Sequence, residues 1–98
     1  MGDFNGKVVV VTGATSGIGA ATAKKFAKLG ANVALIGRNQ QRGVQLENEL
    51  KQHGVNVSFI ACDVSNLKQV ETMVAQVGKS FGRVDVLFNN AGVMLPSM

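Results

Sequence analysis

The 98-residue sequence has no tryptophan, no tyrosine and a single cysteine. Because Cys62 has no second cysteine to pair with, an internal disulfide is excluded, and the sequence is typical of a reducing compartment, which predicts a cytoplasmic location. No apolar run approaches the roughly 18 residues that a membrane-spanning helix needs, so we expect no membrane association. We also expect no secretory signal, since the N-terminus has no basic stretch followed by an apolar core.

Acidic residues are scarce relative to basic ones: six Asp and Glu stand against ten Lys and Arg, which gives a net charge of +4 and a pI near 9.7. The basic residues do not cluster, and no aromatic residues interleave with them to stack on bases. We therefore expect no nucleic-acid partner. Solvated helix faces and one specific anion site account better for the positive charge. We expect no metal site.

Apolar runs and helical periods alternate along the chain. The valine run over 8–11 has no polar alternation, which is typical of a strand buried on both faces. Glycines and capping residues separate the segments. In order, the expected elements are a strand over 7–12, a helix over 18–29, a strand over 32–37, a helix over 39–53, a strand over 55–62, a helix capped by Ser65 and closed by Gly82, and a strand over 84–89.

The first and third expected helices carry residues at spacings of three and four, which place these residues on one side of each helix; in the third helix this stripe is predicted to face the core. In the first helix these residues are Ile18, Thr22, Phe26 and Leu29, and in the third they are Leu67, Val70, Val74, Val77 and Phe81.

Strands and helices alternate along the chain, and the strands have the apolar composition of strands buried on both faces. This pattern predicts parallel strands joined by crossover helices, and therefore an α/β fold. Right-handed crossovers limit the topology. We predict a Rossmann-type, doubly wound parallel sheet in three α/β/α layers with strand order 3-2-1-4, and a crevice above the ends of the first and fourth strands. Residues 1–98 would form one partial NAD(P)-binding domain, truncated after the fourth strand.

The turn after the first strand has the sequence TGATSGIG over 12–19. Gly13 permits a sharp turn, Gly17 lets the backbone approach a ligand closely, and Gly19 allows tight packing of helix on strand. The helix that begins here offers unpaired N–H groups and the positive end of its dipole. A glycine-rich turn in this position, between a buried strand and a helix, predicts a phosphate-binding site.

These residues resemble the TGxxxGxG motif of the short-chain dehydrogenase/reductase family. The resemblance continues at Asp63-Val64, after the third strand, and at Asn89-Asn90-Ala91-Gly92, after the fourth. All three motifs occur in order and together cover nearly the whole chain. We therefore expect a member of this family.

The resemblance implies roles for individual residues in binding a nicotinamide dinucleotide. Asp63 would hold the adenine amino group, with the backbone of Val64 beside it. Asn89 would brace neighbouring strands, or cap its strand without touching the ligand. The pyrophosphate would lie against Gly13, Ser16, Gly17, Ile18 and Gly19, and the ribose and nicotinamide would lie against Asn90, Ala91 and Gly92.

The end of the second strand predicts which cofactor is bound. An NAD site normally presents Asp or Glu about twenty residues beyond the glycine turn, where it binds the ribose hydroxyls. This chain has Gly37 at that position and Arg38 next. A guanidinium can bind a 2′-phosphate with charge assistance. We therefore predict NADP(H) rather than NAD, with Arg42 as a weaker second candidate for the phosphate; alternatively Arg38 is only a solvated loop residue.

In the family, hydride transfer depends on a Tyr-x-x-x-Lys pair, a serine and an asparagine. The chain has no tyrosine, so no catalytic residue is predicted and the chain alone is expected to be inactive. His53 is better explained as a solvated charge at a helix end, and Cys62 as a small buried hydrophobe. The expected parent is an oxidoreductase that interconverts an alcohol and a ketone or aldehyde; the alternative is an inactive NADP(H)-binding or protein-pairing module.

The fourth expected strand has the apolar pattern of a central strand, but in this chain it would lie at an edge. The third helix alone would have to cover one whole face of the sheet. We therefore predict that the chain associates with itself through the fourth strand, or pairs with a missing C-terminal half.

Overall fold

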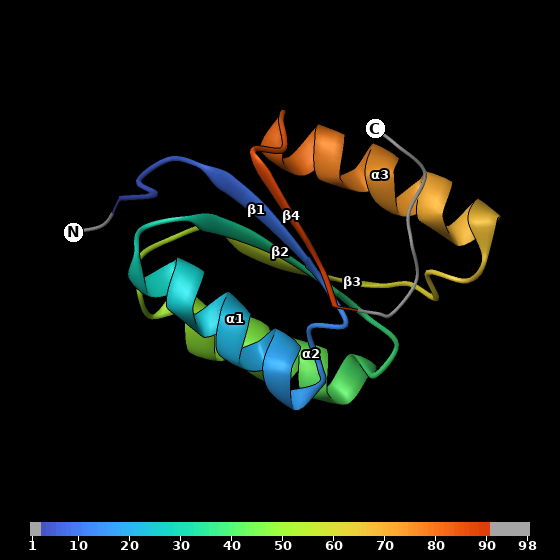
Figure 1. Cartoon of the computed structure of the whole chain (residues 1–98), viewed down its shortest axis with the longest axis horizontal. Coiled ribbons are helices and arrows are strands. Elements are labelled where there is room, and N and C mark those ends of the chain that lie inside the picture. Colours follow the sequence, from blue (N-terminus) through green and yellow to red (C-terminus); the bar gives the residue numbers. More distant parts are fainter. Residues whose placement is uncertain (1–2, 91–98) are drawn as a thin grey trace.

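The computed structural model describes residues 3–90 of the chain. Within this range strands and helices alternate (Figure 1). They are β1 (Val8–Thr12), α1 (Gly17–Lys28), β2 (Asn32–Gly37), α2 (Gln40–Lys51), β3 (Val57–Ala61), α3 (Leu67–Phe81) and β4 (Val86–Asn89).

The strands form one parallel sheet in the order β3-β2-β1-β4. Helices α1 and α2 lie on one face of the sheet and α3 lies on the other (Figure 1). The chain thus steps outward twice from β1 and then returns past it, which puts the third crossover helix on the opposite face. The predicted α/β class, the Rossmann-type doubly wound sheet and the strand order 3-2-1-4 are confirmed.

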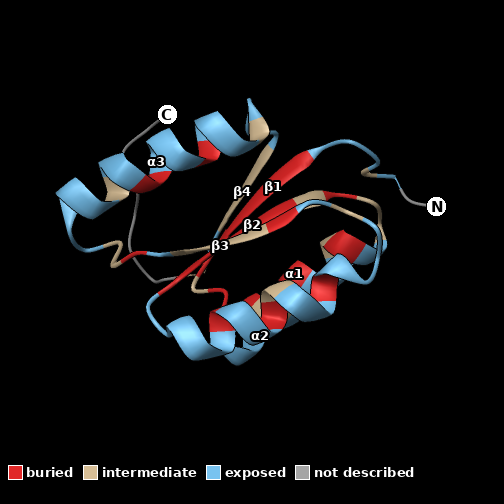
Figure 2. Ribbon diagram, turned by 180° about the vertical axis from the view of Figure 1, so that it is seen from behind, coloured by how far each residue is buried: buried red, intermediate tan, exposed pale blue. Residues whose placement is uncertain are grey.

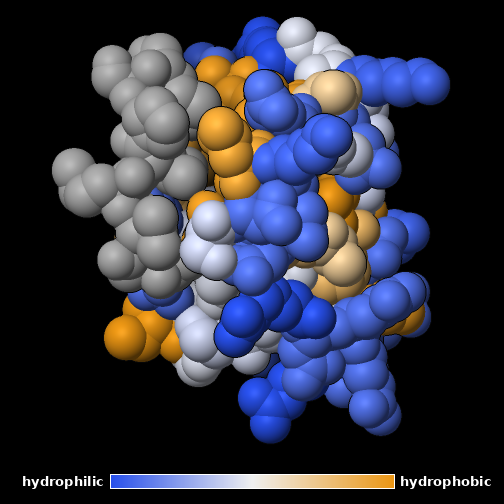
Figure 3. All heavy atoms as spheres, turned by 90° about the vertical axis from the view of Figure 1, so that its right-hand side faces the viewer, coloured by the Kyte–Doolittle hydropathy of each residue, from blue (hydrophilic) through white to orange (hydrophobic). Residues whose placement is uncertain are grey.

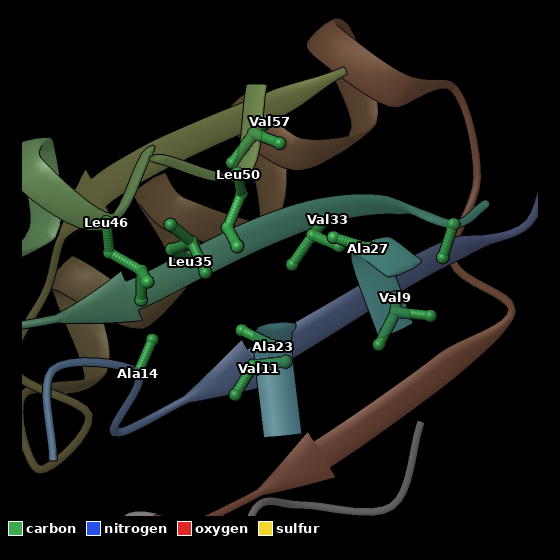
Figure 4. Close-up of a cluster of buried hydrophobic side chains, with 11 residues drawn as sticks. Val9, Val11, Ala14, Ala23, Ala27, Val33, Leu35, Leu46, Leu50 and Val57 are labelled. Atoms are coloured by element: carbon green, nitrogen blue, oxygen red, sulfur yellow. The ribbon is translucent and has the colours of Figure 1, made fainter. Parts of the chain in front are cut away.

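The apolar side chains of β1 and β2 are buried on both faces of the sheet (Figure 2). Val9 and Val11 join a cluster under α1 and α2, whereas Val10 joins a second cluster under α3. Figure 4 shows the first cluster, in which Leu46 and Leu50 of α2 lie beside Leu35 of β2. The unbroken valine run therefore packs two cores at once, as its sequence pattern predicted.

The four residues expected on one side of α1 are not equally buried: Thr22, Phe26 and Leu29 are half-buried. Ile18 is 68% exposed, and the buried residues of the helix are Gly19, Ala23 and Ala27. These small side chains let the helix lie close to the sheet. The larger Phe26 is half-buried against the same core cluster and packs edge-on against Phe4 at a centroid distance of 5.1 Å.

The prediction for α3 needs two corrections. Its N-cap is Asn66 rather than Ser65, because the Asn66 side chain accepts the hydrogen bond from the Gln69 amide (3.1 Å). Its predicted core stripe is partly right: Val77 is buried, and Val70 and Phe81 are half-buried against the same cluster. Leu67 and Val74 are exposed, and Met73 is buried instead.

Strands β3 and β4 are shorter than predicted, and β4 begins at Val86. The residue before it still pairs with β1: the Asp85 amide donates to the Val8 carbonyl (2.9 Å), and the Asp85 carboxylate accepts from the Val8 amide (2.8 Å). Arg83 Nε also donates to this carboxylate (2.9 Å). The bond from Val8 is the main reason that the pKa of the Asp85 carboxyl lies below its usual value.

An apolar groove runs between α3 and β4. Its volume is about 670 Å³, and its walls come from α3, from β1 and from β4 with the turn before it. Exposed apolar side chains of Leu67, Val74 and Val84 belong to it. Among the described residues β4 pairs with β1 alone, so its other side is an open edge of the sheet.

Candidate nucleotide-binding site

The glycine-rich turn joins β1 to α1 with a geometry that only glycine allows at two positions. Gly13 has a φ of +62°, in the left-handed region that side chains disfavour. A Cβ atom at Gly19 would lie 2.1 Å from the Gly13 carbonyl oxygen, so the first turn of α1 can touch the end of β1 only without a side chain there. The roles predicted for Gly13 in turning and for Gly19 in packing agree with this geometry.

Ser16 holds the turn together as the N-cap of α1. Its hydroxyl donates to the Gly13 carbonyl (2.8 Å) and accepts from the Gly19 amide (3.3 Å). It also accepts a hydrogen bond from Asn90 Nδ2 (2.9 Å), which ties the end of β4 to the turn. The Ser16 hydroxyl is thus engaged within the protein, and its contribution to an anion site is to fix the loop.

The first amides of α1 are available to a ligand. Gly17 and Ile18 begin the helix, where backbone N–H groups have no acceptor inside the helix. Within residues 3–90, neither amide has a recorded acceptor in the loop. Among residues 3–90, a Cβ atom at Gly17 would meet nothing within 4 Å, so no packing contact in this part of the chain requires glycine at this position. Free amides beside an open glycine form a cradle for an anionic group.

Arg38 follows the end of β2 and is exposed over 79% of its side chain. Its Nη1 lies 3.8 Å from Oδ2 of Asp63, which follows β3. The guanidinium is therefore positioned at the mouth of the site by a weak, solvent-exposed contact, from which it is free to turn to a stronger anionic partner. Arg42 lies in the first turn of α2, where its amide donates to the Asn39 side chain (3.0 Å).

The hydrogen bonds within its own loop hold Asp63 more firmly than the ion pair with Arg38 does. Its Oδ1 accepts from the Ser65 amide (3.0 Å) and from the Ser65 hydroxyl (2.7 Å). The Asp63 amide donates to Gln69 Oε1 (2.8 Å). The bonds from Ser65, and then the charge of Arg38, hold the pKa of the Asp63 carboxyl below its usual value, so that the carboxylate is ionised at neutral pH.

The ends of β1, β2 and β3 enclose a pocket of about 460 Å³. Its lining brings together the first part of the glycine turn, Arg38 and Asp63, which were predicted, with Thr15 and Cys62, which were not. The predicted residues Gly17, Ile18, Gly19 and Asn90 are not part of this lining. Figure 3 views the molecule from the side at which the strands end, and shows a mostly hydrophilic surface with hydrophobic atoms exposed in its middle. The full lining is Gly13, Thr15, Ser16, Ile36, Gly37, Arg38, Asn39, Cys62, Asp63, Val64 and Ser65.

Thr12 organises the other side of the turn, and sequence reasoning missed it. Its hydroxyl donates to Asn89 Oδ1 (2.9 Å) and accepts from the Asn90 amide (2.9 Å). Thr12 is completely buried, so this hydroxyl fixes both asparagines from inside the sheet. The bracing role predicted for Asn89 agrees with the contact, which is made to a side chain on the neighbouring strand.

The remaining predicted residues are placed as follows. Val64 lines the pocket beside Asp63, and Asn90 contacts the glycine turn through Ser16. Ala91 and Gly92 lie outside the described residues. Cys62 is buried, and burial is the main cause that raises the pKa of its thiol, which agrees with the interpretation of this residue as a small hydrophobe.

The described part of the chain has neither a membrane-spanning helix nor a cluster of metal ligands. No helix in it is long and apolar enough to cross a membrane. In residues 3–90, no three or more His, Cys, Asp or Glu residues come together in a group that could hold a metal ion.

The sheet order, the glycine turn and the pocket over the strand ends define the class of the protein as a Rossmann-type fold. A family model described as short chain dehydrogenase matches residues 7–98. The chain belongs to the short chain dehydrogenase family, as the three motifs predicted.

Relatives and solved structures agree with this assignment. The chain is 44% identical over 94 residues to a 3β-hydroxysteroid dehydrogenase of Mediterraneibacter gnavus, with 96% of this chain and 34% of that protein covered. The L-sorbose reductase of Gluconobacter frateurii, complexed with NADPH and L-sorbose, matches with a TM-score of 0.87 and 42% identity over 100% of this chain and 37% of that one. NAD⁺-bound xylitol dehydrogenase matches with a TM-score of 0.88 and 41% identity, over 93% and 35%. The chain thus spans about a third of the length of these relatives.

Proposed function

We propose that this chain binds NADP(H) as the dinucleotide-binding portion of an oxidoreductase that interconverts an alcohol and a ketone or aldehyde. The observation that carries the proposal is the cradle at the start of α1: the free amides of Gly17 and Ile18 lie beside a glycine whose missing side chain leaves open space. A diphosphate fits this cradle because the amides and the helix dipole favour negative charge.

The adenosine half of the cofactor would occupy the pocket between the glycine turn and the loops after β2 and β3. Asp63 offers an ionised acceptor to the adenine amino group, and the Val64 backbone lies beside it. Asn90, held against Ser16, extends the site towards β4, where the nicotinamide side of the ligand would lie. When bound, the cofactor supplies the hydride chemistry, and these residues bind and orient it.

The choice of NADP(H) over NAD rests on the end of β2. Gly37 presents no carboxylate to the ribose, and Arg38 has only the long contact to Asp63. A 2′-phosphate would offer the guanidinium a shorter, charge-assisted partner. Among the solved relatives, the L-sorbose reductase structure contains NADPH and the xylitol dehydrogenase structure contains NAD⁺, so the preference stays a proposal for this chain.

Calorimetry with two fragments of the cofactor tests the proposal. We expect 2′,5′-ADP to bind about tenfold or more tightly than 5′-ADP, as one charge-assisted contact implies. Arg38→Ala should remove this difference, whereas Arg83→Ala, at the opposite end of the strands, should leave it intact. Equal affinities for the two nucleotides in the unsubstituted chain would contradict the role of Arg38.

The alternative function, an inactive NADP(H)-binding or protein-pairing module, uses the same nucleotide site. We name no residue of this chain as catalytic. Turnover of NADPH with assorted ketones by the purified chain would contradict the prediction that the chain alone is inactive.

We propose that the groove between α3 and β4 is covered by a second copy of the chain. Among residues 3–90 no strand pairs with the outer side of β4, and the apolar groove beside β4 lies along that side. Two copies related by a two-fold axis would pair the β4 edges and cover both grooves.

Light scattering after size-exclusion chromatography tests this pairing. We expect a dimer for the unsubstituted chain and a monomer for Val74→Glu, since Val74 is 48% exposed in the groove. Val44→Glu is the matched control, because Val44 is 40% exposed on α2 at the other face of the sheet. A monomeric unsubstituted chain would contradict the proposal.

A further inference from the structure

The two oxygens of the Asp63 carboxylate have different partners. Oδ1 accepts both hydrogen bonds of Ser65, from the hydroxyl at 2.7 Å and from the amide at 3.0 Å. Oδ2 faces the mouth of the pocket, where its recorded neighbour is Arg38 Nη1 at 3.8 Å. One oxygen is thus engaged within the loop, and the other is available to a ligand.

The start of α3 holds the backbone of the same residue. Gln69 lies in the first turn of α3, where its amide donates to the N-cap residue Asn66 (3.1 Å). Its side chain reaches back beyond the cap and accepts from the Asp63 amide (2.8 Å). The Asn66 amide in turn donates to the Asp63 carbonyl (2.9 Å). In an ordinary capping box the third helical residue would accept from the amide of the N-cap residue itself. Here Gln69 accepts from the amide three residues earlier, which fixes the Asp63 backbone to the helix.

We propose that Ser65 and Gln69 are positioning residues, which orient Asp63 so that Oδ2 is the oxygen presented to the adenine amino group. This inference rests on the proposed function, because it concerns the same pocket. Without the Ser65 hydroxyl the carboxylate keeps only the bond from the amide of residue 65, so Oδ1 is held less firmly and both oxygens can compete for water and for Arg38. Without Gln69 the Asp63 amide loses its acceptor, and the loop between β3 and α3 loses its attachment to the helix.

Ser65→Ala is the direct test, and Ser65→Thr is the conservative variant that keeps the hydroxyl. Ser80→Ala is the matched control, because Ser80 is exposed near the other end of α3. Two quantities are measured on each chain: the Asp63 carboxyl pKa by NMR without nucleotide, and the affinity for 2′,5′-ADP by calorimetry from about pH 3 to pH 8, a range that reaches below the usual pKa of an aspartate. Thermal unfolding checks that each variant is folded.

We expect Ser65→Ala to raise the Asp63 pKa, because the hydroxyl bond favours the charged form. An ionised acceptor is lost as the pH falls through this pKa, so nucleotide affinity should decline at a higher pH in Ser65→Ala than in the unsubstituted chain. At pH 7 we expect a loss of about tenfold, the equivalent of one charge-assisted hydrogen bond. Ser65→Thr and Ser80→Ala should match the unsubstituted chain in both quantities.

Gln69→Ala should weaken 2′,5′-ADP binding, and Gln69→Glu, which keeps an acceptor for the Asp63 amide, should restore it. An unchanged Asp63 pKa in Ser65→Ala would overturn the inference alone. A raised pKa with unchanged nucleotide affinity would also overturn it. Failure of the unsubstituted chain to bind 2′,5′-ADP would instead overturn the proposed function, whatever the pKa measurement gives.

Discussion

Gly19→Ala should lower the free energy of unfolding by about 3 kcal/mol, the upper range for forcing extra atoms into a packed site. The added Cβ would lie 2.1 Å from the Gly13 carbonyl oxygen and 3.0 Å from the Cα of Ala14. Both neighbours are backbone atoms of the glycine turn, so they cannot rotate away as a side chain would. Either α1 moves off the sheet or the turn deforms.

Urea denaturation measures this loss, and Gly17→Ala is the matched control two residues earlier. A Cβ at Gly17 meets nothing within 4 Å, and alanine is the better helix former, so the stability of this variant should be unchanged or higher by up to about 1 kcal/mol. Equal stability of the two variants would contradict the close approach of α1 to the end of β1.

Gly17→Ala should nevertheless weaken NADPH binding about a hundredfold. The open space at Gly17 is where we place the pyrophosphate, and a methyl group there would keep phosphate oxygens out of hydrogen-bonding distance of the first amides of α1. Losing two bonds from amides to a charged group, at about 1.5 kcal/mol each, corresponds to that factor.

Fluorescence titration with NADPH measures this affinity. Gly78→Ala is the control, because Gly78 is a helical glycine of α3 with equally open surroundings on the far face of the sheet. Its affinity should equal that of the unsubstituted chain. If Gly17→Ala also binds with unchanged affinity, the ligand does not rest on the start of α1.

The sheet could be predicted because the apolar sequence of a buried strand is visible within a few consecutive residues. The valine run over 8–11 has no polar residue, and burial on both faces explains that composition directly. The glycine turn was predictable for the same reason, since Gly13 and Gly19 each meet a constraint set by residues within a few positions.

Helix faces were predicted less well, because spacing alone does not weigh side-chain size. In α1 the close approach at Gly19 leaves room for alanines only, so Ile18 turns outward although it lies at an apolar spacing. In α3 the predicted core stripe included Leu67 and Val74, but these two side chains are exposed beside the groove next to β4. Met73, which the stripe left out, is buried in the core.

Two parts of the site were beyond sequence reasoning. Thr12 contacts asparagines 77 and 78 positions away, and no local pattern connects a threonine at a strand end with such partners. Ser65 and Asn66 are neighbouring residues that both suit an N-cap, and the sequence does not indicate which one caps α3. The structure assigns the cap to Asn66, which leaves Ser65 to bind Asp63.

The central claim, that the mouth of the β1–α1 turn is the dinucleotide site, is tested most directly by following the backbone amides during an NMR titration with NADP⁺. The account predicts saturable shifts concentrated in residues 13–19, 37–39 and 62–65, with the amides of Gly17 and Ile18 among the largest. Residues facing the groove between α3 and β4 should move little. Shifts centred on that groove, with the amides of 13–19 unmoved, would contradict the account.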